Sequence, residues 1–170
     1  QAIESSTREL EKVKQRVLSE LGETESEIFT SHLTMLQDRE FTENIKRRVE
    51  RDLVNVEQAI EDEVSHLIVL LQEVESEFHR ERANDIRDVG QRLLRHLGSE
   101  KQTRLDSLPP NTVLIARELL PSETVNLDRK DVTAIITEEG GETGHTAILA
   151  RSLGIPAATG EFLDLRLEFL

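Results

Sequence analysis

The sequence predicts a multidomain α+β protein, in which a helical bundle is followed by a small α/β domain. Residues 1–100 contain three glycines and no proline, and their apolar residues recur every three or four positions, which is the period of an amphipathic helix. Residues 112–160 instead combine short runs rich in β-branched residues with glycine and proline turns, a pattern typical of alternating strands and helices. Residues 101–111 are predicted to form the linker, and residues 161–170 form an unassigned tail.

Four stripes of apolar residues predict the helices of the first domain. Gly22 follows the first stripe and Gly98 follows the last, as glycine often does at the C-terminus of a helix. Amphipathic helices hide their apolar faces against one another, which predicts a bundle. The stripes are Ile3, Leu10, Val13, Val17 and Leu21; Ile28, Phe29, His32, Leu33 and Leu36; Val56, Ile60, Val64, Leu67, Leu71, Val74 and Phe78; and Ala83, Ile86, Val89, Leu93 and Leu97.

The second domain is predicted to run strand, turn, helix, strand. Thr112–Ala116 and Val132–Thr137 are β-rich runs, separated by residues 121–124, PSET. A helical pattern covers His145–Leu153 and stops at a glycine and a proline, after which Ala157–Thr159 begin another strand.

Composition excludes several classes of function. The chain has no cysteine, so disulfides, thiol catalysis and thiolate metal sites are excluded. The formal charge of −13 argues against a nucleic-acid partner, because phosphate backbones attract clustered Lys and Arg. It favours basic protein partners, although acidic residues that merely keep a helical protein soluble are the simpler explanation. The longest apolar run, Leu67–Leu71, is too short to cross a membrane, and no signal sequence opens the chain, so we expect a cytoplasmic protein.

A glycine-rich turn before a histidine is the chemically informative stretch. Gly140 and Gly141 permit a tight turn, and His145 then falls in the first turn of the predicted helix, with Thr143 or Gly144 as its N-cap. The first turn of a helix offers backbone N–H groups and the positive end of the dipole, which favour a phosphoryl dianion and keep an attacking imidazole neutral. By spacing alone, a structural glycine turn with an incidental histidine is the simpler interpretation.

Residues 140–151, GGETGHTAILAR, resemble the phosphohistidine signature G-G-x-T-[ST]-H-x-[AS]-I-x-A-R of phosphoenolpyruvate-utilising enzymes. Residues 118–124 and 81–90 are similar to segments of one member of that family, Enzyme I of the bacterial phosphotransferase system. Residues 27–32 and 36–38 resemble the helix with which Enzyme I docks its carrier protein, HPr. The resemblance implies a bundle of the HPr-binding type and a swivelling phosphohistidine domain.

The resemblance also implies an activity and the residues that carry it. His145 would accept a phosphoryl group from phosphoenolpyruvate on Nε2 and pass it to a histidine of HPr, in the service of sugar transport. Thr124, Gly140, Gly141, Thr143 and Arg151 would surround the phosphate. Glu23, Glu25, His32, Met35, Asp38 and Glu40 would line the HPr-binding face, for which an ordinary solvated face is the alternative.

Two residues depart from the family pattern. Gly144 stands where the family usually has Ser or Thr, and Glu142 stands where Enzyme I often has Arg. Neither change touches the nucleophile, although a carboxylate beside a phosphoryl group would repel it unless it points away. The remaining histidines, His66, His79 and His96, have no partners at metal spacing and are expected to be ordinary core or surface residues.

The resemblance places other functions outside these residues. No cofactor or metal site is expected within the chain, whereas Mg²⁺ and phosphoenolpyruvate would bind a further domain of a homodimeric full-length enzyme. Residues 166–170 faintly resemble a segment of that domain. The alternative function is that of a regulatory Enzyme I paralogue, of the nitrogen type or multi-domain, which acts as a phosphorylation-dependent binding module.

Overall fold

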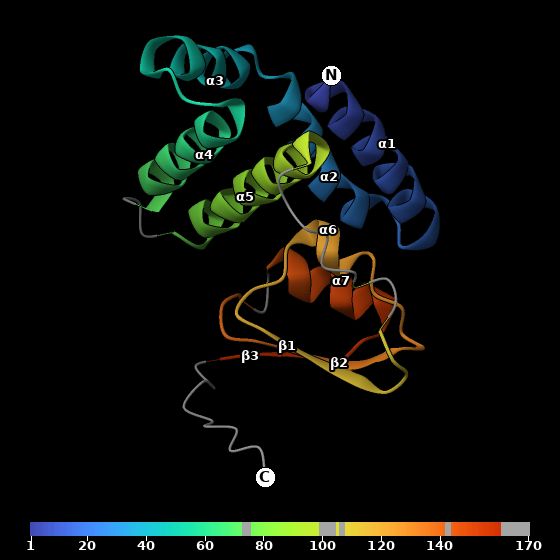
Figure 1. The fold of residues 1–170 in the computed structure, drawn as a ribbon. Helices are drawn as coiled ribbons and strands as arrows, with labels where there is room; N and C mark the ends of the chain where they lie inside the picture. The colour runs from blue at the N-terminus through green and yellow to red at the C-terminus, as the bar shows by residue number, and fades with distance from the viewer. Residues whose placement is uncertain (73–75, 99–104, 106–107, 142–143, 161–170) are drawn as a thin grey trace. The chain divides into compact units, whose positions relative to one another are not determined.

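A computed structural model describes residues 1–72, 76–98, 105, 108–141 and 144–160. The chain divides into two compact units, residues 1–103 and 104–170, and each is described by itself. The first is a helical bundle and the second a small α/β unit (Figure 1). The predicted fold class is confirmed.

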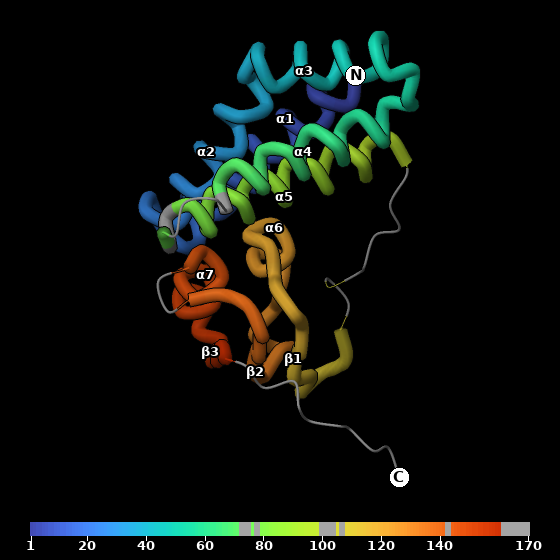
Figure 2. Tube along the Cα trace, turned by 90° about the vertical axis from the view of Figure 1, so that its left-hand side faces the viewer, coloured from blue at the N-terminus to red at the C-terminus, as the bar shows by residue number. Residues whose placement is uncertain are grey.

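The helical unit is built around its last helix. Its elements are α1 (Ala2–Glu20), α2 (Glu23–Gln37), α3 (Arg39–Asp52), α4 (Val56–Gln72) and α5 (Glu77–Leu97). Helix α5 contacts α1, α2 and α4, and Figures 1 and 2 both show it running alongside α4. Leu10, Phe29, Leu36, Val89 and Leu93 are fully buried between these helices, and each such side chain contributes about 1.5–3 kcal/mol to stability.

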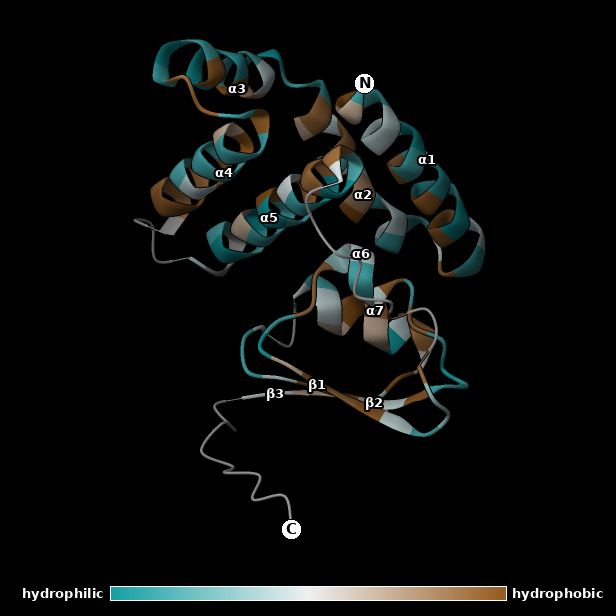
Figure 3. Cartoon of the chain, viewed as in Figure 1, coloured by the Kyte–Doolittle hydropathy of each residue, from teal (hydrophilic) through white to brown (hydrophobic). Residues whose placement is uncertain are grey.

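The helical elements differ from the sequence prediction at two places. The third predicted stripe does not form one helix, because α4 ends at Gln72 and α5 begins at Glu77. Helix α3 was not predicted at all. It is mostly hydrophilic (Figure 3), and it is anchored by the buried side chains of Phe41 and Ile45, one helical turn apart.

An ion-pair cluster ties the first helix of the unit to the last. Glu9 on α1 pairs with Arg92 on α5, and its other carboxylate oxygen lies 2.7 Å from Nε2 of His96. Arg92 is 1% exposed, so its charge needs this partner inside the fold. Burial raises the pKa of Glu9, but the charge of Arg92 and the hydrogen bond of His96 outweigh burial, and the pKa lies below its ordinary value.

The α/β unit contains a parallel three-stranded sheet of order β1-β2-β3. Its elements are β1 (Thr112–Ala116), α6 (Pro121–Thr124), β2 (Val132–Thr137), α7 (His145–Leu153) and β3 (Ala157–Thr159). Strands β1, β2 and β3 and helix α7 have the predicted bounds. Residues 121–124, which separate the first two strands, form the short helix α6. Pro121 occupies its first turn, where its missing N–H is not needed.

Helices α6 and α7 lie on the same face of the sheet (Figure 1). Leu114 and Ala116 of β1 pack towards the core on that side. Because successive strand residues point to opposite faces, Val113 and Ile115 lie on the other face, where they are 49% and 55% exposed. The core of the unit comprises Leu119, Leu127, Val132, Ile135, Ala150 and Ile155.

Candidate functional site

His145 is the first residue of helix α7. Gly144 is its N-cap, with φ −65° and ψ 156°, and its carbonyl accepts a hydrogen bond of 3.0 Å from the N–H of Ile148. Gly144 has no side chain with which to cap the helix. The N–H groups of the first turn therefore present the positive end of the helix dipole beside the imidazole.

The loop before α7 is tied to the neighbouring strand. Gly140 has φ +127°, a left-handed conformation that favours glycine. Its carbonyl accepts a hydrogen bond of 3.2 Å from the hydroxyl of Thr159, and the N–H of Gly160 donates to the carbonyl of Thr137 at 3.1 Å. These bonds hold the turn against the end of β3.

One threonine joins the start of α7 to the backbone before α6, and another is hydrogen-bonded within the turn of α6. Thr146 donates its hydroxyl hydrogen to the backbone carbonyl of Leu119, with Oγ1 2.6 Å from the oxygen. Thr124, which is fully buried, donates in the same way to the carbonyl of Leu120 at 3.0 Å. Because Leu119 and Leu120 are consecutive, the two threonines are fixed to one short piece of backbone, and His145 lies beside Thr146 in the chain.

The structure brings together some of the predicted phosphate-site residues and separates others. Gly140 and Gly141 lie in the loop before His145, and Thr124 is the last residue of α6, which contacts α7. Thr143 lies outside the described residues. Arg151 is exposed in the last turn of α7, about 9 Å along the helix axis from His145 at 1.5 Å per residue, so the backbone does not place it at the histidine.

The predicted HPr-binding residues fall at both ends of α2. Glu23 and Glu25 are in its first turn, whereas Met35 and Asp38 lie at its other end, about 20 Å away. The side chains of Glu23, Asp38 and Glu40 are exposed, and those of Glu25 and Met35 are half-buried. Oδ1 of Asp38 also caps α3, because it accepts from the N–H of Glu40 at 2.6 Å and of Phe41 at 3.2 Å.

His32 is a correction to that prediction. Its side chain is 0% exposed, and Nε2 lies 3.1 Å from Oδ1 of Asp85 and Nδ1 lies 3.9 Å from Oδ2 of Asp88. Phe29 packs edge-on against the ring at 5.7 Å between centroids. A side chain enclosed in this way between α2 and α5 cannot contact a partner directly, so the prediction that His32 lines the HPr-binding face is wrong. The prediction that it belongs to the apolar stripe of this helix is confirmed.

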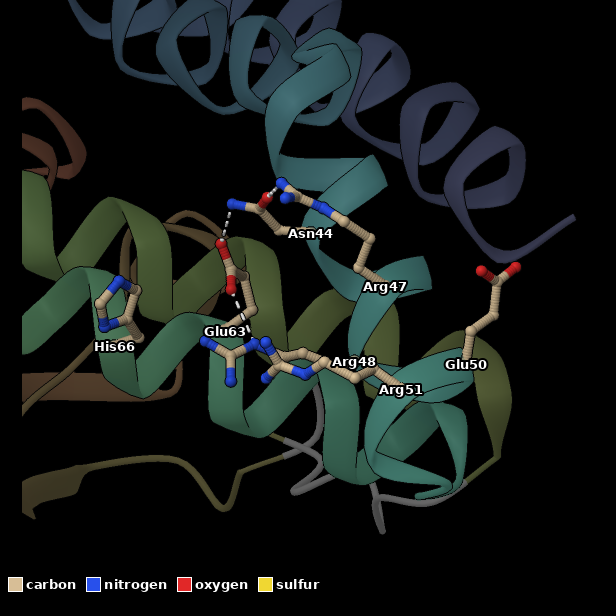
Figure 4. Close-up of a pocket in the computed structure, with 7 residues that line it drawn as sticks. All are labelled: Asn44, Arg47, Arg48, Glu50, Arg51, Glu63 and His66. Atoms are coloured by element: carbon tan, nitrogen blue, oxygen red, sulfur yellow. Dashed lines mark hydrogen bonds and ion pairs between the residues drawn. The ribbon is translucent and has the colours of Figure 1, made fainter.

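A pocket of about 520 Å³ opens between α3 and α4 in the helical unit. Its residues are Asn44, Arg47, Arg48, Glu50, Arg51, Glu63 and His66 (Figure 4). Glu63, 1% exposed, accepts from the amide of Asn44 at 2.7 Å and from Nε of Arg48 at 2.8 Å.

Two of the three arginines that line this pocket are paired with carboxylates. Arg48 neutralises Glu63, and Arg51 makes two hydrogen bonds with Asp52, at 2.7 and 3.1 Å, which raise the pKa of Arg51. A buried carboxylate whose two oxygens are both bonded is a packing element. No local sequence pattern predicts this network, because Asn44 and Glu63 are 19 residues apart.

The described part of the chain holds no group of three or more His, Asp or Glu side chains able to bind a metal ion. Among the described residues, no helix combines the length and apolar character that a membrane crossing requires.

Two family comparisons cover most of the chain. Residues 108–161 match the mobile domain of phosphoenolpyruvate-utilising enzymes, and residues 1–82 match their N-terminal domain. The chain is 38% identical over 160 residues to phosphoenolpyruvate-protein phosphotransferase of Bacillus subtilis (strain 168) and 39% identical over 159 residues to that of Geobacillus stearothermophilus. Each alignment covers 94% of this chain and 28% of the relative, so the chain spans just over a quarter of the length of the curated relatives it matches.

Solved structures agree with the fold. The NMR solution structure of Enzyme I (nEIt) aligns with a TM-score of 0.70 and 37% identity, over 94% of this chain and 64% of that one. The N-terminal domain of Enzyme 1 - Nitrogen aligns with a TM-score of 0.62 over 93% of this chain and 64% of that one, and its identity of 24% shows a shared fold alone.

Proposed function

Because the chain belongs to the phosphoenolpyruvate-utilising enzymes and contains their N-terminal and mobile domains, we propose that it is the phosphohistidine-carrying part of a phosphotransferase-system Enzyme I. In this proposal His145 exchanges a phosphoryl group with a histidine of HPr. The single observation that carries it is the position of His145 as the first residue of α7, directly after an N-cap glycine that has no side chain.

The helix start supplies the electrostatics of a phosphohistidine. A dianionic phosphoryl group at the first turn is stabilised by the backbone N–H groups and the dipole, typically by about 0.3–1 kcal/mol when exposed and up to about 2 kcal/mol when partly buried. The same field disfavours the imidazolium cation and so favours the neutral form of the ring, which is the nucleophilic form. Nδ1 of His145 is buried, which supports Nε2 as the attacking nitrogen.

The proposed step is a direct transfer between two nitrogens. The Nε2 lone pair of His145 attacks the phosphorus, the bond between phosphorus and the HPr histidine breaks, and its electron pair returns to that nitrogen. No water enters, and the step is reversible because both bonds are phosphoramidates. Phosphoryl transfer of this kind depends mainly on positioning and charge stabilisation.

Other parts of the proposal concern partners of the full-length enzyme. The exposed carboxylates Glu23, Asp38 and Glu40, together with Glu25 and Met35, would meet a basic surface of HPr. Phosphoenolpyruvate and Mg²⁺ would act in a further domain of a homodimer that serves sugar transport in the cytoplasm, and no residue described here is assigned to them. The regulatory nitrogen-type alternative has support from a shared fold alone.

The test of the proposed function uses phosphorylated HPr as the donor. His145→Ala should abolish transfer of labelled phosphate to the chain, whereas His66→Ala, which removes an exposed histidine of α4, should leave labelling unchanged. The label on the wild type should be lost in mild acid and survive base, as a phosphoramidate does. Labelling that persists in His145→Ala would place the phosphate on another residue and refute the proposal.

A further inference from the structure

One face of helix α3 carries a group of arginines beside the pocket between α3 and α4. Arg47 and Arg48 lie four and three positions before Arg51, so the side chains leave the helix on the same side, and all three line the pocket. With Lys46 they place four of the 21 Lys and Arg of the chain within six residues. On a chain of charge −13 this is a local excess of positive charge.

The buried end of the pocket is fixed by Glu63 of α4. Its side chain is 1% exposed, and its two oxygens accept from the amide of Asn44 at 2.7 Å and from Nε of Arg48 at 2.8 Å. Arg48 is therefore held in one position by a carboxylate that cannot move into solvent. A donor that is already held in place loses less conformational entropy when it binds a ligand.

The three guanidinium groups keep N–H donors that the described residues do not use. A guanidinium has five such donors. Arg48 donates from Nε, Arg51 from Nε and Nη2, and Arg47 from Nη2, and in the part of the chain that the structure describes Nη1 of each has no hydrogen-bond acceptor. The acceptor for Arg47 is the neutral amide of Asn44, and Glu50 points away from the guanidinium groups (Figure 4).

These donors match the chemistry of a phosphate group. Like charges in one pocket repel one another, and an anion between them relieves that repulsion. A phosphate monoester presents three terminal oxygens in a tetrahedral arrangement, which can accept from guanidinium groups in several directions, whereas a carboxylate presents two oxygens in one plane. The volume of about 520 Å³ lies within the range of about 300–1,000 Å³ that is usual for small-molecule sites, so it has room for an organic group besides the phosphate.

We infer that Arg47, Arg48 and Arg51 form a binding site for a small phosphate ester, whose phosphate oxygens accept hydrogen bonds from the guanidinium groups. Arg48 is the fixed member of the site, and the exposed side chains of Arg47 and Arg51 supply the outer contacts. The inference goes beyond the proposed function. It uses neither His145 nor the α/β unit, so either conclusion can fail without the other.

The test titrates glycerol 3-phosphate into the whole chain at constant ionic strength and about pH 7.5, where a phosphate monoester carries nearly two negative charges. The arginine Nε–H signals are followed by NMR, and those of Arg47 and Arg51 are assigned by their loss in Arg47→Gln and Arg51→Gln. The signals should shift in a saturable way, with a Kd below about 1 mM. Each of the two substitutions should raise that Kd about fivefold or more, because a charge-assisted hydrogen bond is lost.

Lys46→Gln is the matched control. It removes the same charge from the same helix, but Lys46 does not line the pocket and instead lies 2.7 Å from Oε1 of Glu43, so the Kd should stay within about twofold of the wild type. Arg48 is left unchanged, because its loss would leave Glu63 buried without a charged partner. Circular dichroism should show the same helix content in the wild type and in all three variants.

Three outcomes would overturn the inference. Shifts that do not saturate up to about 20 mM glycerol 3-phosphate would mean that the pocket holds no phosphate ester. A Kd that rises equally in Lys46→Gln and in the two arginine variants would mean that the basic residues are a solvated face that attracts anions without a site. Malonate, a dicarboxylate, should bind about fivefold more weakly or worse, and equal binding of malonate would refute the assignment to phosphate.

Discussion

Gly140 and Gly144 lie four residues apart in the loop before α7, and glycine is favoured at the two positions for different reasons. Gly140 needs it for its backbone, since φ is +127° while the space around a Cβ is open, with the nearest atom, Oγ1 of Thr159, at 3.7 Å. Gly144 has φ −65°, which any residue adopts, but a Cβ there would lie 3.3 Å from the carbonyl oxygen of Gly141.

This difference predicts opposite effects on stability. Gly140→Ala should lower the free energy of unfolding by about 1–2 kcal/mol through backbone strain. Gly144→Ser should raise it by a few tenths of a kcal/mol, because a serine hydroxyl can cap the helix once the loop yields by a few tenths of an ångström. Denaturant unfolding of the two variants and the wild type measures both values. Equal destabilisation by the two changes would contradict this account.

At the residue scale, the sequence predicted the start of α7 because local rules decide it. The start of the helix is marked by two glycines and by Gly144 as N-cap, and its end is marked by Gly154. The distant contacts of these residues could not be predicted in this way. The bond from Thr146 to Leu119 and the burial of His32 against Asp85 join segments 27 and 53 positions apart, and no local pattern encodes such pairs.

At the scale of elements, Asp38 has two roles that can be separated. Its carboxylate caps α3, and its charge is part of the proposed HPr-binding face. Asp38→Ser should keep the cap and remove the charge, which weakens HPr binding while changing stability by less than about 0.5 kcal/mol. Asp38→Ala should weaken binding and also cost about 1 kcal/mol of stability. Binding titrations and thermal unfolding of both variants test this, and a serine variant that binds HPr as the wild type does would remove Asp38 from the face.

Helix α3 also shows why one element escaped prediction. In its sequence, REFTENIKRRVERD, the buried residues are Phe41 and Ile45. Two apolar residues are too few to show a helical period. The informative signal was local: Asp38 precedes the helix as an N-cap, with an apolar residue three positions later. The strands β1, β2 and β3 were predicted correctly because each is a β-rich run bounded by turn residues.

At the scale of the whole chain, the ion-pair cluster of Glu9, Arg92 and His96 makes the stability of the helical unit depend on pH. The pKa of Glu9 is lower in the folded state than its ordinary value of 4.5, so its contribution to stability is fully present above about pH 4.5 and is lost as the pH falls through the folded-state pKa. Glu9→Gln should therefore cost about 1–2 kcal/mol at pH 7, reduced from the value of a fully buried pair because Glu9 is partly solvated.

That cost should shrink as the pH falls below 4.5 and through the folded-state pKa of Glu9, because Glu9 then becomes protonated in the wild type as well. Denaturant unfolding of the wild type and of Glu9→Gln across this range measures the difference. Glu4→Gln is the control, since Glu4 is an exposed carboxylate of the same helix. A stability difference between wild type and Glu9→Gln that stays constant from pH 7 to pH 3 would contradict the role assigned to Glu9.

The uncovered side of the sheet has a consequence for the colloidal behaviour of the chain. Val113 and Ile115 are about half exposed there, on a molecule whose charge of −13 makes its copies repel one another at low ionic strength. At about 1 M salt that repulsion reaches only about 3 Å, while the attraction between apolar strips persists. The osmotic second virial coefficient should therefore change from positive to negative as salt is added, and Ile115→Thr should move that crossing to higher salt.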